Sequence, residues 1–199
     1  MRKLWGLYLG LLDNHPLVTK SLSTGFLMGT GDILAQKFEH KFKGTNGDEK
    51  GEFKLNYKRV ITMSTVGVLY SGPMLHYWYK SLDVMIKGES KSVVIKKMLV
   101  DQLVFAPFAI GGFMTVMNFI NNSGELKDLD NFPSSLFYAV KINWLLWPAA
   151  QIVNFSLVPP NLRVLYSSII SIFWSMFLSH ISFDKDHTTR NHNKTKEIN

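Results

Sequence analysis

The chain has 199 residues, a formal net charge of +7 and no cysteine. The lack of cysteine excludes disulfides, thiolate metal sites and a cysteine nucleophile. A positive charge can indicate a nucleic-acid-binding protein, but the Lys and Arg residues lie in the connections and the C-terminal tail, where membrane proteins carry them. No basic patch with interleaved aromatic residues occurs, so we expect no direct binding to nucleic acid.

Four long windows of the sequence contain no Asp, Glu, Lys or Arg. They cover residues 60–79, 102–124, 142–162 and 164–183. A helix needs about 20 mostly apolar residues to cross the hydrocarbon core of a membrane. The sequence therefore predicts an all-α, polytopic membrane helix bundle with four to five embedded helices, for which the lipid bilayer is the first partner.

The chain begins with a segment whose apolar residues recur at helical spacing. They follow the pattern i, i+3, i+4, i+7, i+8, which places them on one stripe of a helix (Leu4, Leu7, Tyr8, Leu11, Leu12). This pattern predicts a short N-terminal interfacial helix that ends at His15-Pro16. The first span is then expected over residues 17–37, followed by a polar, charged connection over residues 38–58.

Proline residues interrupt the next two predicted helices. The second covers residues 59–86 and contains Gly72-Pro73, and the third resumes at Ser92 and contains Pro107. Proline removes one backbone hydrogen bond and its ring clashes with the preceding turn. We therefore expect each helix to kink or break at its proline.

Two further apolar segments complete the predicted membrane domain. The fourth span covers residues 134–157 and stops before Pro159-Pro160, and a last hydrophobic helix covers residues 162–183. Residues 1–183 are thus predicted to form a single integral membrane domain. The remaining residues, 184–199, are polar, and we expect them to form a disordered tail.

The first span carries a seam of small and polar residues on one helix face. The residues are spaced four, four, three and four apart (Ser21, Gly25, Gly29, Asp32, Gln36). Small residues four apart let a second helix approach closely. Asp32 either is paired in the bundle core or forms a charged element of a pore wall. A phosphate-binding loop is excluded because no Gly-Lys-Ser/Thr follows these glycines.

A second set of polar residues lies in the third helix, at the sequence Asp101-Gln102. Lys97 precedes Asp101 by four residues, so a local ion pair is one interpretation of the two charges. Arg163 lies between two apolar windows, where it either extends to a membrane interface or pairs with an acid. The candidate acids are Asp32, Asp83 and Asp101.

The fourth span is the most polar of the predicted helices for its depth. Its polar residues form one face at steps of four, four and three, and a proline lies within that run (Asn143, Trp147, Pro148, Gln151, Asn154). Carboxamides, indole N–H groups and a carbonyl freed by the proline can line a wet cavity for neutral or anionic solutes. The alternative is interhelical hydrogen bonding, which stabilises a membrane bundle by about 0.6 kcal/mol per contact.

No motif for catalysis is recognisable in the sequence. It contains no Ser-His-Asp arrangement, no paired catalytic carboxylates and no nucleotide fingerprint, and its tail histidines lack partners at metal-ligand spacing. We therefore expect that the protein is not an enzyme and that it uses no cofactor and no metal.

Several motifs along the chain match a known family in order. They are "GFLMGTGDILAQ" at residues 25–36, "GPMLHYWYKSLD" at 72–83, "KKMLVDQLVFAP" at 96–107 and "NWLLWPAAQIVNFSLVPPNLR" at 143–163. In these motifs the chain resembles the family of Mpv17 and the peroxisomal membrane proteins. The match extends over nearly the whole chain through Ser179.

The resemblance implies a channel-like or transporter-like protein of the mitochondrial inner membrane, with the peroxisomal membrane as the alternative location. It also implies a role in metabolite or nucleotide-precursor supply, in mitochondrial DNA maintenance and in the stress response. The solute is of unknown identity. The alternative function is a non-conducting scaffold that organises inner-membrane complexes. The further expected partners are a second copy of the chain or an inner-membrane complex.

Overall fold

The computed structural model describes residues 2–43, 52–126 and 129–176, and within this part every regular element is helical. The predicted all-α class is confirmed. The predicted tail, the end of the last predicted helix and most of the charged connection lie outside the described residues.

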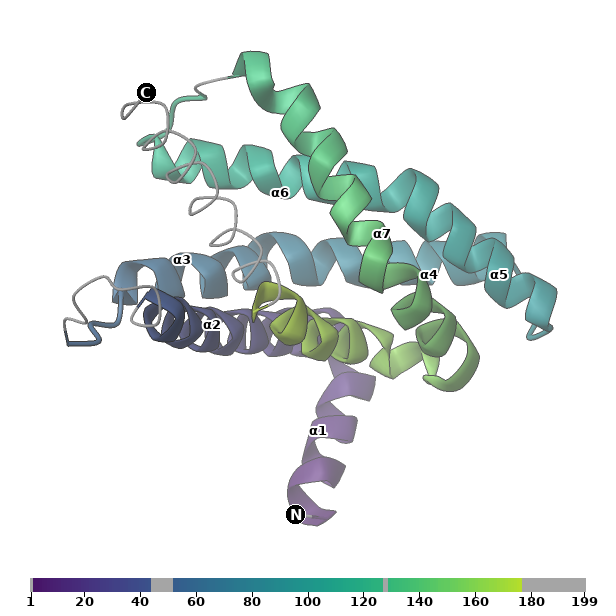
Figure 1. Cartoon of the computed structure of the whole chain (residues 1–199). Coiled ribbons are helices and arrows are strands. Elements are labelled where there is room, and N and C mark those ends of the chain that lie inside the picture. The colour runs from purple at the N-terminus through teal and green to yellow at the C-terminus, as the bar shows by residue number, and fades with distance from the viewer. Residues whose placement is uncertain (1, 44–51, 127–128, 177–199) are drawn as a thin grey trace.

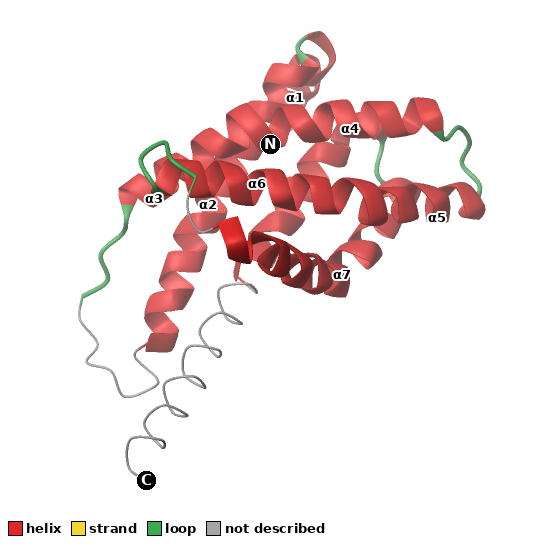
Figure 2. Cartoon of the chain, turned by 90° about the horizontal axis from the view of Figure 1, so that it is seen from above, coloured by secondary structure: helices red, strands yellow, loops and turns green. Residues whose placement is uncertain are grey.

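The described helices follow one another along the chain (Figure 1): α1 (Arg2–Asn14), α2 (Pro16–Lys43), α3 (Tyr57–Val66), α4 (Gly72–Met85), α5 (Lys91–Val100), α6 (Ala106–Asn121) and α7 (Phe132–Leu157). Short 3-10 turns precede α7 and the last helix, which covers residues 163–176. Helices α3 and α4 form one rod and α5 and α6 another, while α1 projects away from the bundle (Figures 1 and 2).

Local sequence signals set several helix ends. Helix α2 begins at Pro16, which is suited to a first turn because the missing N–H would have no partner there. The hydroxyl of Thr19 donates to the carbonyls of Leu11 and His15, which joins α1 to α2. Helix α2 continues six residues beyond the predicted end, to Lys43.

The prolines of the second and third predicted helices do not break them. A π-helical turn lies immediately before each Gly/Ala-Pro pair, at Gly67–Ser71 and at Asp101–Phe105. In these turns the N–H groups of Gly72 and Ala106 donate to carbonyls five residues back. The wider turn lets the chain remain helical through Pro73 and Pro107, because the carbonyls that the rings would strike are displaced. Helix α7 also runs without interruption through Pro148.

Glycines bring α2 very close to the α3–α4 rod. A Cβ atom built on Gly25 would lie 2.7 Å from the carbonyl oxygen of Ser64, and one built on Gly67 would lie 2.6 Å from the Cα of Gly25. A Cβ on Gly29 would also collide with the Ser64 side chain. Side chains at these positions would force the two helices apart, so the small residues of the seam fix this crossing.

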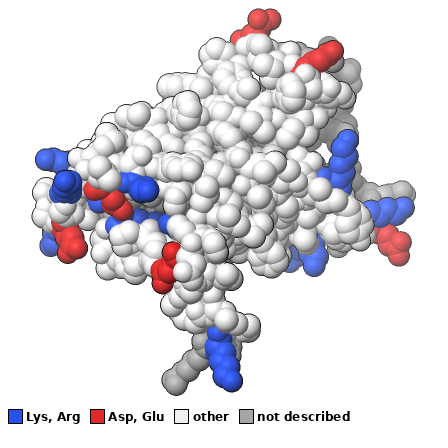
Figure 3. Space-filling view, turned by 180° about the vertical axis from the view of Figure 1, so that it is seen from behind, with Lys and Arg blue, Asp and Glu red and all other residues white. Residues whose placement is uncertain are grey.

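Within the described residues, one helix is long and apolar enough to cross a membrane. It is the α5–α6 rod, Lys91–Asn121, with 31 residues. The expected count of four to five embedded helices therefore stays a prediction. On the face of the molecule in Figure 3, the charged side chains lie toward the edges and a broad uncharged surface lies between them.

Candidate functional site: a cavity inside the bundle

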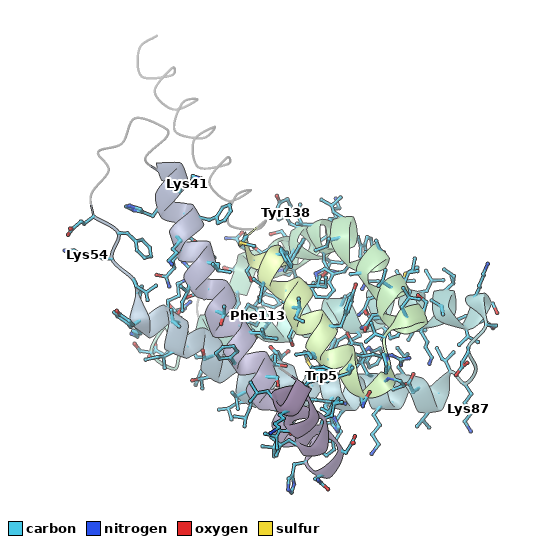
Figure 4. All side chains as sticks on the ribbon, turned by 90° about the horizontal axis from the view of Figure 1, so that it is seen from below. Trp5, Lys41, Lys54, Lys87, Phe113 and Tyr138 are labelled. Atoms are coloured by element: carbon cyan, nitrogen blue, oxygen red, sulfur yellow. The ribbon has the colours of Figure 1, made fainter. Side chains whose placement is uncertain are left out.

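The helices surround a partly open cavity of about 640 Å³. One part of its wall is polar and includes hydroxyl, carboxamide and carboxylate groups (Thr24, Asp32, Asp101, Gln102, Asn143, Gln151, Ser167, Ser171, Ser175). The other part is apolar and rich in methionine and aromatic residues (Met28, Met63, Met74, Phe105, Phe113, Trp147, Trp174). Phe113 lies in the middle of the bundle in Figure 4. The cavity is thus amphipathic.

Asp101 is the centre of a hydrogen-bond network in the cavity wall. Its side chain is only 2% exposed. One carboxylate oxygen accepts from the indole N–H of Trp78 at 2.8 Å, and the other accepts from the amides of Gln102 and Gln151, each at 2.8 Å. Three N–H donors from three segments therefore converge on one carboxylate, which fixes α4, the second π-turn and α7 relative to each other.

The second π-turn lets two neighbouring residues, Asp101 and Gln102, both take part in this network. Asp101, Gln102 and Phe105 are all buried in this turn. The amide of Asn143 donates to the side-chain oxygen of Gln102 at 3.0 Å, and the indole of Trp144 donates to its backbone carbonyl at 3.2 Å. In an α-helix the backbone carbonyl of Gln102 would accept from the N–H of Ala106. Here that N–H donates to the carbonyl of Asp101 instead. Trp144 therefore satisfies a backbone group that the π-turn leaves free.

The network continues from α7 to the last helix. The amide of Gln151 also donates to the hydroxyl of Tyr79 at 3.1 Å, and this hydroxyl shares a hydrogen bond of 2.6 Å with that of Ser167. Asn154 donates to Gln151 at 2.9 Å and to Ser167 at 3.2 Å, and it is fully buried. Asn154 does not line the cavity.

A charged cluster marks one end of the cavity. The guanidinium of Arg59 contacts Asp32 at 2.6 Å and donates two hydrogen bonds to Glu39 at 2.9 and 3.0 Å. Gln36 donates to the second oxygen of Asp32 at 2.7 Å. Asp32 is thus paired in the bundle and also lines the cavity, and its cationic partner is Arg59 rather than Arg163.

Arg163 belongs to a separate cluster that does not line the cavity. It donates to both oxygens of Asp83, at 2.5 and 2.7 Å, and the ammonium of Lys97 contacts the same carboxylate at 2.5 Å. The expected local pair of Lys97 with Asp101 is therefore wrong. The i, i+4 spacing brings the two residues to one region of the helix, but the carboxylate of Asp83 on α4 provides the closer partner.

Comparisons with known proteins identify relatives of this chain. Residues 130–179 match the model of the Mpv17 / PMP22 family. The chain is 82% identical to "PXMP2/4 family protein 2" of Dictyostelium discoideum over the full length of both. It is 34% identical to the mitochondrial inner membrane protein Mpv17 of Homo sapiens over 176 residues, 88% of this chain and 96% of that protein. The chain belongs to the Mpv17 / PMP22 family. It is also 30% identical to peroxisomal membrane protein 2 of Bos taurus over 174 residues, 87% of each chain, and no solved structure matches it.

In this member of the Mpv17 / PMP22 family, the cavity gathers residues from both predicted polar faces. Asp32 lies at its charged end, whereas Gln102, Asn143 and Gln151 lie in the network around Asp101. Trp147, from the same predicted face of α7, also lines the cavity, and its ring meets that of Trp174 edge to face at 6.5 Å. Gln36 stays outside the cavity wall, where it accepts from the backbone N–H of Asn56.

Sequence reasoning missed several cavity residues. Ser167, Ser171 and Ser175 are four residues apart on the last helix, a spacing that places them on one face and could have been recognised. Arg59 was expected only as the first residue of the second predicted helix, and no role was predicted for Tyr79 within that helix. No pattern in the sequence marks these two, because their roles depend on which helices lie opposite them.

Proposed function

We propose that this protein is a polytopic membrane helix bundle that admits small solutes to its internal cavity and passes them across the mitochondrial inner membrane. The relatives support a membrane location, since their names refer to the mitochondrial inner membrane and to the peroxisomal membrane. The peroxisomal membrane is therefore the alternative. The four to five charge-poor helices would form the membrane domain, with α1 lying at the interface.

The observation that carries this proposal is the amphipathic cavity of about 640 Å³. Cavities of 300–1,000 Å³ with an apolar lining and a few placed polar groups are typical binding sites for small molecules. The hydroxyl groups of the last helix and the carboxamides of Asn143 and Gln151 could replace water around a polar solute. Polar groups inside a membrane helix bundle commonly mark a solute pathway.

The cavity ends at Tyr79 on the side of the Asp83 cluster. Beyond it the side chains of Leu82, Phe155 and Val164 form an apolar core in which each residue is at most 7% exposed. At the other end, Arg59 is 37% exposed. We propose that the structure represents a state closed at the Tyr79 side, and that passage of a solute requires this core to separate.

The biological role that we propose is the one implied by the resemblance to the family. Passage of metabolites or nucleotide precursors would support their balance inside the mitochondrion, and through it mitochondrial DNA maintenance and the response to stress. In this proposal the cavity residues bind and release solute without a catalytic step.

A cavity-filling variant tests the proposal. In Ser171→Trp an indole would occupy the cavity, so we expect solute flux into liposomes that contain the purified protein to fall to the lipid background. Ser156→Trp is the matched control, because Ser156 is exposed on α7 and does not line the cavity. Flux that is equal in both variants and in the unchanged protein would contradict a route through the cavity.

The second candidate function is a non-conducting scaffold for inner-membrane complexes. The observation in its favour is that protein groups satisfy every oxygen of Asp101, so the network holds helices together without any solute. A scaffold predicts that Ser171→Trp leaves permeability at the lipid background, as in the unchanged protein. It also predicts partners that co-purify with the unchanged protein and are lost when exposed apolar surfaces are altered.

A further inference from the structure

Three buried cationic side chains gather around one carboxylate at the end of the bundle opposite the Arg59 cluster. Lys97 and Arg163 both contact Asp83, and each is 6% exposed. Lys20 of α2 is 8% exposed, and its charge interacts with that of Asp83. Within the described residues, however, the side chain of Lys20 makes no hydrogen bond and no ion pair. The cluster therefore carries three positive charges and one negative charge.

An excess of buried positive charge is costly unless an anion compensates it. The groups near Lys20 supply no further anion. The titratable groups whose charge interacts with it are His76 and Asp83, and the carboxylate of Asp83 already contacts both Lys97 and Arg163. Two further polar atoms in this region, the hydroxyl of Ser21 and Nδ1 of His76, are buried without a hydrogen-bond partner in the described part of the chain. The residues of this cluster thus leave unused donors and an unbalanced charge.

The surroundings of the cluster indicate where an anion would come from. Four exposed lysines flank it on α4, on α5 and in their connection (Lys80, Lys87, Lys91, Lys96). Figure 4 shows Lys87 at this end of the bundle, and Lys41 and Lys54 at the other end. Exposed apolar side chains lie on the same helices next to the charged residues, including Val84 and Met85, which are 65% and 69% exposed. Positive charge beside exposed apolar surface is suited to the boundary between phospholipid headgroups and acyl chains.

We propose that the Lys20–Lys97–Arg163 cluster binds the phosphate group of an anionic phospholipid. The guanidinium of Arg163 and the ammonium of Lys20 would contact the phosphate oxygens, while the exposed apolar side chains of α4 and α5 would contact the acyl chains. The site is separate from the cavity, since none of the three cations lines it. It adds a lipid-binding function to the proposed passage of solutes and does not depend on that passage.

Lipid-dependent thermal stability of the full-length protein in detergent tests this site. We expect phosphatidylglycerol to raise the melting temperature and phosphatidylcholine to leave it unchanged. Lys20→Gln should weaken the apparent affinity for phosphatidylglycerol about tenfold, as the loss of one hydrogen bond to a charged group would. The matched control is Lys37→Gln, an exposed lysine of the same helix, and it should respond to lipid as the unchanged protein does.

Loss of a direct side-chain contact does not account for this result, because within the described residues the Lys20 ammonium makes no hydrogen bond or ion pair and interacts with Asp83 only at longer range. Without lipid, Lys20→Gln should be at least as stable as the unchanged protein, since the substitution removes an unbalanced buried charge. An equal response of Lys20→Gln and Lys37→Gln to phosphatidylglycerol would overturn the proposal. A Lys20-dependent shift with inorganic phosphate alone, and none with phosphatidylglycerol, would overturn the assignment to a lipid.

Discussion

Replacing Asp101 with asparagine would place an NH₂ group where a carboxylate oxygen now accepts hydrogen bonds. In the protein, one oxygen accepts from Trp78 and the other from Gln102 and Gln151. A carboxamide has a single oxygen, so it can keep the two glutamine donors or the tryptophan donor, but not all three. In the better orientation the carboxamide keeps the glutamines, and the indole N–H of Trp78 then faces another donor.

The expected cost follows from these contacts. One orphaned buried donor destabilises a protein by about 1–3 kcal/mol, and the two remaining hydrogen bonds lose about 1 kcal/mol each when their acceptor is no longer charged. Hydrogen bonds inside membrane bundles are often weaker, about 0.6 kcal/mol per contact, which sets a lower limit near 2 kcal/mol for three contacts. We therefore expect Asp101→Asn to lower the free energy of unfolding by about 2–5 kcal/mol.

Unfolding of the purified protein in mixed micelles by increasing sodium dodecyl sulfate, followed by circular dichroism, measures this change. The matched control is Asp130→Asn, because Asp130 is exposed in the 3-10 turn before α7. The control should stay within about 0.5 kcal/mol of the unchanged protein. If Asp101→Asn also stays within about 0.5 kcal/mol, the carboxylate does not hold the centre of the bundle and the reasoning is refuted.

The same assay checks two further contacts. Gly25→Val should lose about 1–3 kcal/mol of stability, because its side chain would overlap Ser64, whereas Gly10→Ala, with no atom within 4 Å of the new methyl, should change little. Equal stability of these two variants would show that α2 and α3 are not in close contact. Arg59→Gln should lower the free energy of unfolding by about 1–2 kcal/mol, because it leaves Asp32 without a cation. This loss is smaller than for a fully buried ion pair because Arg59 is partly exposed. Adding Asp32→Asn should recover at least half of that loss, and no recovery would mean that Arg59 acts through other groups.

Much of the helix layout was predictable because its signals are local. The pattern of Leu4, Leu7 and Leu11 predicts the N-terminal helix, and Pro16 lies at the boundary where α2 begins. The small residues Gly25 and Gly29 predicted a close helix contact, and a Cβ at either position would collide with Ser64 of the facing helix. Such features depend on residues a few positions apart, so the sequence contains all the information they need.

The response to the prolines was not predictable in the same way. A sequence rule states what Pro73 and Pro107 remove from an α-helix, and a break or kink is then the simplest expectation. The chain does not break but forms a π-turn before each proline, and the second of these turns is stabilised by the indole of Trp144 from another helix. A tertiary contact thus supplies the hydrogen bond that the local sequence lacks.

The sequence by itself determined the helical class, the apolar segments and the presence of polar residues within them. Charge-free windows of about 20 residues and polar residues at steps of three and four are properties of one chain read in order. Only the tertiary structure decided that Asp32 pairs with Arg59, that Arg163 and Lys97 share Asp83, and that a cavity separates the two clusters. The physical reason is that a buried charge pairs with whichever opposite charge the facing helix brings within contact distance, and helical spacing says nothing about the facing helix.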